Sequence, residues 1–282
     1  MILVADSGST KCDWALIDAK NNITEFQTMG FNPLFHSEDL IVETLRKHQA
    51  VDAHFKSVTF LYYFGAGTGS ETLRLSMQAA LKKVFPFAEK ISTHTDLQGA
   101  ALATYEGTPC ICCILGTGAN ACFYDGHNLK EKNPALGFIL GDEGSGAFFG
   151  KKLLAAYLYR QLPPYLMTAF EEQYGLNKEI IIEKIYRAPR ANVFLASFMP
   201  FFHAHRNDEF IRKILSNGFR HFFLEHVLCF KGYRNLPVHF VGSIAYFFSA
   251  ELLIEANRLG ITLGQIVSRP IEKLKGLDWK SN

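Results

Sequence analysis

The sequence predicts an α/β protein made of two lobes that share one plan. Three observations predict it: a strand–turn–strand unit opens the chain, strands and helices then alternate, and a second strand–turn–strand unit begins about 108 residues later. The first unit is "ILVA", "DSGSTK", "CDWALID", and the second is "CICCIL", "GTGAN", "ACFYDG". This internal repetition places a ligand in the cleft expected between the lobes.

The first half alternates strands with helices. A third strand is expected at 23–30, with further strands at 57–67 and 90–94. Helical spacing of apolar residues predicts helices at 38–49 and 70–85, and one from Leu97 to about Tyr105. These elements form a predicted N-terminal lobe of residues 1–107.

The second half is expected to be mostly helical. Helices are predicted at 146–162, between Asp208 and Lys231, and at 244–260, with a strand at 237–243 leading into the last of them. The predicted C-terminal lobe is 108–282, although residues from about 268 onward can pack back on the first lobe.

Composition is that of an ordinary globular protein. The 282 residues are 48% hydrophobic and 20% charged, and the formal net charge of +2 does not favour nucleic acid or an acidic membrane as a partner. No apolar run reaches the ~18 residues of a transmembrane helix. The chain enters a strand directly, without a basic region and cleavage site, so a cytoplasmic protein is expected.

Six cysteines fit that compartment. Three lie in "CICCIL", where Cys112 and Cys113 would point to opposite faces of a strand, which makes joint metal ligation awkward. No CxxC pair or His-rich spacing indicates zinc. The cysteines are therefore interpreted as reduced thiols of the core.

The first turn has two interpretations. Gly8 allows close approach to an anion, Ser7, Ser9 and Thr10 supply hydroxyls, and Asp6 could hold Mg²⁺ through water. A plain β-hairpin is the alternative, because Asp and Gly are common turn residues. The same two interpretations apply to the second turn, where Gly116 and Gly118 flank Thr117, and Asn120 adds an amide. Because the two turns occupy matching positions in a duplicated unit, the sequence favours a pair of phosphate-binding loops.

Two carboxylates lie where a strand or a glycine-rich segment leads into a helix. In "GDEGSG", Asp142 and Glu143 can cap the following helix, yet three glycines in six residues suggest a ligand whose hydroxyls Asp142 accepts from. In "THTDLQGA", Asp96 is either the N-cap of a helix or the base that takes the proton from an attacking hydroxyl.

Two further residues have both a structural and a ligand-binding interpretation. Asn32 in "GFNPLFH" has a turn as its default interpretation. In "FVGSIA", Gly242 could support a nucleotide base or ribose, or serve helix–strand packing.

Taken in order, "ADSGSTKCDWALID", "THTDLQGA", "LGTGAN", "GDEGSG" and "FVGS" resemble the N-acetylglucosamine kinases and the related BadF/BadG/BcrA/BcrD ATPase family. The resemblance spans nearly the whole chain. It implies a duplicated ribonuclease-H-like fold of the actin-like, hexokinase and Hsp70 ATPase superfamily, with two lobes and a nucleotide and sugar cleft between them.

The resemblance also implies site residues. Asp96 matches the catalytic base for the 6-hydroxyl, and Asp6 the carboxylate near the metal. The implied ATP- and phosphate-binding residues are Ser7, Gly8, Ser9, Thr10, Lys11, Gly116, Thr117, Gly118, Ala204, Gly242 and Ser243. The implied substrate-binding residues are Asn32, Gly65, Ala119, Asn120, Gly137, Phe138 and Asp142.

Three departures from the family pattern concern the ligand loops. The first loop has Ser-Gly-Ser where many relatives have three glycines, and Ala119 stands where a serine is common. The tract "NPALGFIL" before Asp142 lacks a tryptophan found in some sugar kinases, and this tract is expected to line the sugar pocket. The departures bear most on which sugar is accepted.

The leading hypothesis is an ATP- and Mg²⁺-dependent kinase acting on the 6-hydroxyl of an amino sugar, most simply N-acetylglucosamine. Its partner is then a small molecule, with no nucleic acid or membrane, and a homodimer is compatible. Alternatives are a kinase of another hexosamine or an anhydro-sugar, a BadF/BcrA-type ATPase that acts on a protein partner, and a sugar sensor without turnover.

Overall fold

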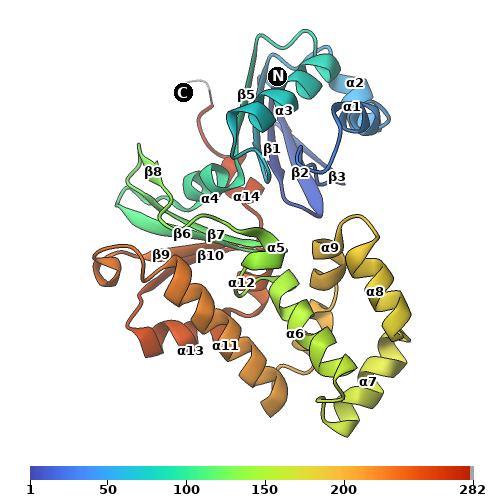
Figure 1. The fold of residues 1–282 in the computed structure, drawn as a ribbon. Helices are drawn as coiled ribbons and strands as arrows, with labels where there is room; N and C mark the ends of the chain where they lie inside the picture. Colours follow the sequence, from blue (N-terminus) through green and yellow to red (C-terminus); the bar gives the residue numbers. More distant parts are fainter. Residues whose placement is uncertain (280–282) are drawn as a thin grey trace. The chain divides into compact units, whose positions relative to one another are not determined.

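A computed structural model of the chain describes residues 1–279, which divide into two compact units (Figure 1). Unit 1 comprises Met1–Thr108 and the C-terminal segment that begins at Arg269. Unit 2 comprises Pro109–Ser268. Each unit contains one five-stranded sheet. The predicted C-terminal range also includes 280–282, which lie outside the described residues.

The sheet of unit 1 has the strand order β3-β2-β1-β4-β5. β1 pairs antiparallel with β2, and β2 with β3, whereas β4 is parallel to β1 and β5 is parallel to β4. The strands are β1 Ile2–Ser7, β2 Lys11–Ile17, β3 Ile23–Met29, β4 Phe60–Gly65 and β5 Lys90–Thr95. All five predicted strands of this half are confirmed, and β4 is shorter at both ends than predicted.

Helices cover both faces of this sheet, because side chains alternate along its strands. Leu3 and Ala5 of β1 belong to a core shared with α1 and α3, while Ile2 and Val4 belong to a second core shared with α4 and α14. The helices of unit 1 are α1 Glu38–Arg46, α2 Gln49–His54, α3 Glu71–Val84, α4 Asp96–Thr104 and α14 Ile271–Leu274.

Two predicted helix boundaries in unit 1 are wrong. The helix expected at 38–49 ends at Arg46, because the backbone of His48 is extended (φ −82°, ψ 122°) and a separate helix, α2, starts after it. Thr95, rather than Asp96, is the N-cap of α4: its hydroxyl accepts a hydrogen bond from the N–H of Gln98 (3.2 Å).

The sheet of unit 2 repeats this plan. Its order is β10-β9-β6-β7-β8, with β6–β7 and β7–β8 antiparallel and β6–β9 and β9–β10 parallel. The strands are β6 Cys110–Leu115, β7 Ala119–Tyr124, β8 Leu129–Lys130, β9 Val238–Val241 and β10 Leu263–Val267. Each strand of unit 1 therefore has an equivalent in unit 2, which confirms the predicted duplication; β8 and β10 were not predicted.

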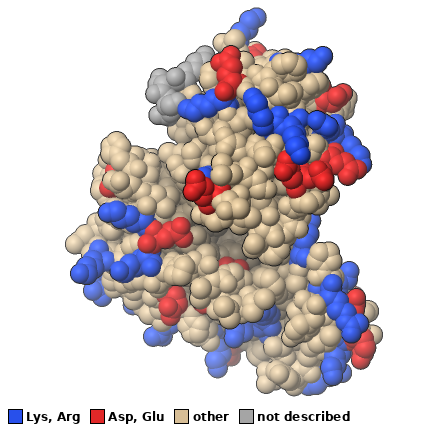
Figure 2. Space-filling view, turned by 45° about the horizontal axis from the view of Figure 1, so that its top comes forward, with Lys and Arg blue, Asp and Glu red and all other residues tan. Residues whose placement is uncertain are grey.

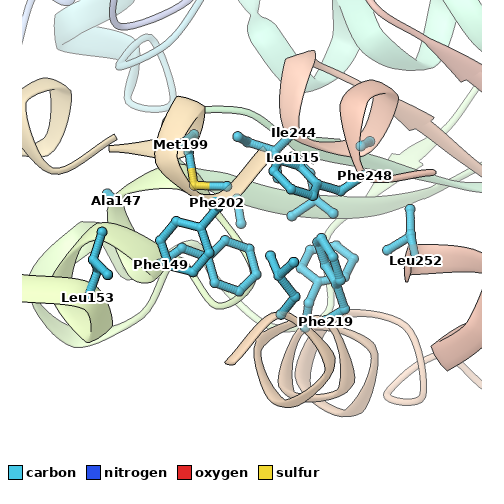
Figure 3. Packing of buried hydrophobic residues seen from close by; sticks show 14 of the residues in the cluster. Leu115, Ala147, Phe149, Leu153, Met199, Phe202, Phe219, Ile244, Phe248 and Leu252 are labelled. Atoms are coloured by element: carbon cyan, nitrogen blue, oxygen red, sulfur yellow. The ribbon is translucent and has the colours of Figure 1, made fainter. Parts of the chain in front are cut away.

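The core of unit 2 packs the sheet against helices. Phe149 of α6 packs edge-on to Phe219 of α11 (5.2 Å between ring centroids) and against Phe202 of α10 (5.6 Å), next to Leu115 of β6 (Figure 3). The helices are α5 Gly137–Leu140, α6 Gly146–Leu158, α7 Pro164–Tyr174, α8 Lys178–Tyr186, α9 Ala191–Ala196, α10 Met199–Ala204, α11 Glu209–His226, α12 Ser243–Phe247 and α13 Ser249–Leu259, with a 3₁₀ turn η1 Tyr233–Asn235.

The predicted helices of unit 2 are confirmed in place, but three are too long. α6 ends at Leu158 and α11 at His226. The helix expected at 244–260 is divided into α12 and α13 at Phe248, whose backbone leaves the helical region (φ −113°, ψ 29°). Phe248 is buried against the core of unit 2, so tertiary packing accounts for a break that helical periodicity does not predict.

Charged side chains of both signs are interspersed on the face seen in Figure 2, in keeping with the small net charge. Within residues 1–279, none of the helices combines the length and the apolar character that crossing a bilayer requires.

Candidate functional site

In unit 1, the carboxyl ends of three parallel strands meet at one edge of the sheet. Ser7 of β1 pairs with Gly65 of β4, and Gly65 pairs with Thr95 of β5. Asp6 and Asp96 therefore lie at the same edge as Gly65. In open α/β sheets ligands bind at this edge, outside the carboxyl ends of the strands.

The turn between β1 and β2 is closed by its own backbone and by the end of β3. The N–H of Gly8 donates to the carbonyl of Lys11 (3.0 Å), and the N–H of Gly30 donates to the carbonyl of Thr10 (3.1 Å). A Cβ at Gly30 would overlap the carbonyl oxygen of Gly8. Sequence reasoning missed Gly30; a glycine as the last residue of a predicted strand was the available signal.

One predicted phosphate ligand has a different role. The side chain of Ser7 is fully buried, and its hydroxyl donates to the carbonyl of Phe31 (3.3 Å) and accepts from the N–H of Phe31 (3.0 Å). The Ser7 hydroxyl is thus used inside unit 1 and is removed from the candidate phosphate donors. Gly8 and Thr10 are exposed, and Ser9 is half-buried.

Two nearby carboxylates and burial affect the protonation of Asp6 in unit 1. Asp6 lies opposite Asp13 across the β1–β2 pair, and its burial, together with the charges of Asp13 and Asp96, raises its pKa to about 7. Asp13 is buried and is held by Lys11 (3.2 Å) and by Arg269 (2.9 Å). Sequence reasoning missed Asp13 and Arg269, which are far apart along the chain.

Asp96 is the first residue of α4. Its Oδ1 accepts a hydrogen bond from the N–H of Leu97 (2.9 Å), and the side chain is half-buried. Gly99, one turn later, lets α4 pack closely on β4, since a Cβ there would lie 2.8 Å from the Cβ of Phe64. Strand and helix together therefore fix the position of the Asp96 carboxylate.

Asn32 follows β3 and is set by local contacts. Its Oδ1 accepts from the N–H of Leu34 (2.9 Å), and its carbonyl accepts from the N–H groups of Phe35 and His36 (2.9 Å each). The predicted turn at Asn–Pro is confirmed by these bonds. Gly67, which follows β4 with φ +79°, has the Asn32 amide where a side chain would otherwise stand.

In unit 2, the turn between β6 and β7 contacts a helix. The N–H of Gly116 donates to the carbonyl of Gly118 (3.0 Å). The first N–H groups of α6 donate to this turn: Gly146 to the carbonyl of Gly116 (2.8 Å) and Ala147 to that of Thr117 (3.1 Å). The second glycine turn is therefore attached to the N-terminus of α6.

Asp142 bonds to the residue after this turn. Its Oδ1 accepts from the N–H of Ala119 (3.1 Å), burial raises its pKa, and its backbone is left-handed (φ +58°). The alternative interpretation, in which Asp142 or Glu143 caps the helix, is wrong, because Ser145 is the N-cap of α6 and accepts from the N–H of Phe148 (3.1 Å).

Three further candidate residues of unit 2 lie on β7 and in α5. Asn120, on β7, donates from Nδ2 to Glu131 (3.3 Å), and its Oδ1 accepts from the N–H of Ala121 (2.8 Å). Gly137 and Phe138 lie in α5, where Lys151 of α6 donates to the carbonyl of Phe138. α5 was not predicted as a helix.

Gly242 lies beside the second turn. Its φ is +114°, and a Cβ there would overlap the carbonyl oxygen of Leu115, so only glycine fits. Ser243 starts α12 and is exposed; Ala204 ends α10 and is also exposed. Close packing explains Gly242 without a ligand, and the bare backbone it leaves is also what a nucleotide could contact.

The cysteines of "CICCIL" are buried free thiols in β6, as is Cys122 opposite Cys112 in β7. Burial raises the pKa of Cys113 well above its usual value. Among the described residues, no cluster of three or more His, Cys, Asp or Glu side chains is arranged to hold a metal ion.

Each unit has the same five-stranded sheet order, with a glycine turn between its first two strands. This repeat is the actin-like ATPase fold that the sequence predicts. The chain matches no protein-family profile and no curated protein. Among solved structures it is similar to a Porphyromonas gingivalis protein described as a "Putative N-acetylglucosamine Kinase", with 37% identity, TM-score 0.91, and 98% of this chain and 97% of that one covered.

Two more distant structures share the fold. A "Putative N-acetylglucosamine Kinase" from Chromobacterium violaceum has 17% identity and a TM-score of 0.74, and 97% of each chain is covered. A ROK family glucokinase from Streptomyces griseus, in complex with glucose and AMPPNP, has 14% identity and a TM-score of 0.55, covering 98% of this chain and 96% of that one. The chain belongs to the N-acetylglucosamine kinase family, a family of sugar kinases.

Proposed function

We propose that this chain transfers the γ-phosphoryl group of ATP to the 6-hydroxyl of N-acetylglucosamine. The P. gingivalis relative is described as a putative N-acetylglucosamine kinase and shares 37% sequence identity over nearly the whole chain. This similarity supports an amino sugar as the acceptor. The nucleotide analogue and sugar bound to the S. griseus glucokinase, which has the same fold, support ATP as the donor.

The observation that carries the proposal is the position of Asp96. Its carboxylate lies at the start of α4, at the ligand-binding edge of the unit 1 sheet, and is near enough to Asp6 to raise the pKa of that acid. A kinase needs such a carboxylate as a base for the attacking hydroxyl.

In the proposed reaction, the 6-hydroxyl oxygen forms a bond to the γ-phosphorus and the bond from that phosphorus to the β–γ bridging oxygen breaks. Asp96 accepts the hydroxyl proton, and ADP leaves with the electrons of the broken bond. Backbone N–H groups of the two glycine turns, with the Thr10 and Thr117 hydroxyls, are the proposed phosphate ligands. Gly242 and Ser243 are proposed to contact the nucleoside.

Mg²⁺ fits the acidic edge of unit 1. Burial first, and then the charges of Asp13 and Asp96, raise the pKa of Asp6, so negative charge gathers at this edge; a carboxylate oxygen is a ligand that Mg²⁺ prefers. Asp6 is the proposed residue to hold the ion, directly or through water. When bound, the ion would neutralise phosphate charge; it would bring phosphate and water ligands, because Mg²⁺ is usually held by few protein groups.

The proposed sugar contacts are Asn32, Asn120 and Asp142. Asp142 keeps one carboxylate oxygen on the Ala119 N–H, and the other oxygen can accept from a sugar hydroxyl. Contacts of this kind discriminate between sugars by their hydroxyl pattern. Another hexosamine or an anhydro-sugar is the alternative acceptor that such contacts would also allow.

The test is ADP release with Mg-ATP against a panel of hexoses, hexosamines and anhydro-sugars. We expect release that depends on N-acetylglucosamine, with 6-phosphate as the product. A different sugar as the best substrate would replace the acceptor and keep the kinase. ADP release that no sugar stimulates would contradict the proposal and favour an ATPase acting on a protein partner.

A further inference from the structure

The loop between α5 and α6 has an unusual backbone. Asp142 has φ +58° and Gly144 has φ +71°, both in the left-handed region. L-residues other than glycine adopt this region infrequently, although Asp tolerates it better than most, so surrounding contacts help to maintain it. The contacts around the loop that carries the proposed sugar ligand Asp142 therefore bear on its conformation.

One contact holds the loop on the side of the glycine turn, and another holds it on the side of α11. The first is the bond from the Ala119 N–H to Asp142. The second joins Glu143 Oε2 to Nε2 of His226 (3.2 Å). His226 is the last residue of α11, its side chain is only 6% exposed, and its ring stacks on Phe222 (5.1 Å between centroids).

The loop also packs directly against α11. A Cβ at Gly144 would lie 3.0 Å from the Cβ of Phe222 and 3.3 Å from the carbonyl oxygen of Gly218. Within the described chain, Nδ1 of His226 is buried without a hydrogen-bond partner, so the bond to Glu143 is the ring's polar attachment. Asp142 and Glu143, neighbours in sequence, are thus fixed by two different elements.

We infer that His226 and Glu143 are positioning residues that hold Asp142 in the geometry with which it binds the sugar. The inference rests on the proposed role of Asp142. Without the bond to His226, Glu143 is released, and the left-handed Asp142 can relax to a more favourable backbone that no longer presents its carboxylate in the same place. The pair acts on sugar binding through the loop, without touching the phosphates.

The experiment measures kcat and KM for the sugar and for ATP in His226→Leu, Glu143→Ala and the double variant. We expect the KM for the sugar to rise about tenfold in each single variant, as for loss of one hydrogen bond to a charged group, with the KM for ATP within twofold of the parent. The double variant is expected to match the single ones, because both remove the same contact.

A conservative variant and a matched control separate positioning from general damage. In His226→Gln the side-chain amide nitrogen takes the place of Nε2, and it should restore the KM for the sugar to within about threefold of the parent. The control is His221→Leu, an exposed histidine of the same helix, which should change neither KM. If His226→Leu does not fold, Glu143→Ala, at a side chain 22% exposed, tests the same bond.

Two results would overturn the inference. One is an unchanged KM for the sugar in both single variants. The other is a KM for ATP that rises as much as that for the sugar, with no rescue by glutamine. Asp142→Asn, measured in parallel, separates this inference from the proposed function: if it raises the KM for the sugar while the His226 and Glu143 variants do not, only the inference fails. If Asp142→Asn leaves the KM unchanged, the role proposed for Asp142 fails, and the inference with it.

Discussion

The two units share a strand order but differ in what surrounds their first turn. In unit 1 the turn is closed by the end of β3, a strand of seven residues, through Gly30. In unit 2 the equivalent strand, β8, has two residues, and the turn is attached to the N-terminus of α6. The two units therefore keep the same sheet order although the turn between the first two strands is supported by a strand in unit 1 and by a helix in unit 2.

The units differ equally in charge at matching positions. In unit 1, Asp6 pairs across the strands with Asp13; in unit 2, the pair one residue before the end of β6 is Ile114 with Asn120. At these matching positions unit 1 therefore has two acids, while unit 2 has an apolar and an amide side chain. The acid beside the second turn, Asp142, comes instead from the loop before α6.

The largest effect is expected at the proposed base. Asp96→Asn should lower kcat by about 100-fold to 10,000-fold, because the amide cannot accept the hydroxyl proton, and should leave the KM for ATP nearly unchanged. Asp142→Asn, at the proposed sugar ligand of unit 2, should act mainly on the KM for the sugar. Steady-state kinetics on both variants tests whether Asp96 acts on kcat and Asp142 on the KM for the sugar. A nearly full kcat in Asp96→Asn would contradict the role of Asp96 as the base.

Asp6 should make the stability of the protein depend on pH. Its pKa of about 7 in the folded chain lies above the ordinary 3.8, so the unfolded chain loses this proton first as the pH rises. The free energy of unfolding should fall between about pH 4 and 7, by up to about 4 kcal/mol, and Asp6→Asn should remove this fall. Urea unfolding at pH 5 and pH 8, without Mg²⁺, measures it; equal pH dependence in both proteins would contradict the prediction.

A smaller effect is expected from close packing at the second turn. Gly242→Ala places a methyl group on the carbonyl of Leu115 in a backbone conformation that favours glycine, and should lower the free energy of unfolding by about 2–3 kcal/mol. The control is Gly116→Ala, where no atom lies within 4 Å of an added Cβ. Denaturant unfolding of both variants tests this; similar losses would show that steric overlap is not the cause.

The smallest effect is expected where the C-terminal segment meets β2. Arg269→Met removes the bond to the buried Asp13 and the ion pairs to Glu25 and Glu272. Lys11 and Gln27 remain as partners of Asp13, and the arginine is itself about one-third exposed. We expect a loss of about 1–2 kcal/mol, less than for a fully buried ion pair. Lys273→Met, at an exposed lysine of α14 in the same C-terminal segment, is the control in thermal or urea unfolding, and should stay within about 0.5 kcal/mol of the parent.

Sequence reasoning succeeded where a signal is local. Apolar strand patterns predicted β1, β2 and β4, and helical spacing predicted α3 to within one residue at each end. It failed for β8, because two residues carry no periodicity, and for β10, whose sequence "LGQIV" contains a glycine and a polar residue. It overlooked Asp13, since an acid in the middle of a strand has no meaning until its partner is known.

What the sequence by itself determined is the duplicated plan, the two glycine turns and the acids that follow strands and glycine-rich segments, because these depend on neighbours along the chain. Only the tertiary structure decided which polar groups are occupied. It turned the Ser7 hydroxyl inward to Phe31, made Ser145 rather than Asp142 the helix cap, and brought His226 to Glu143 and Arg269 to Asp13. Such contacts join residues far apart in the chain, and their partners are set by packing, which local patterns do not encode.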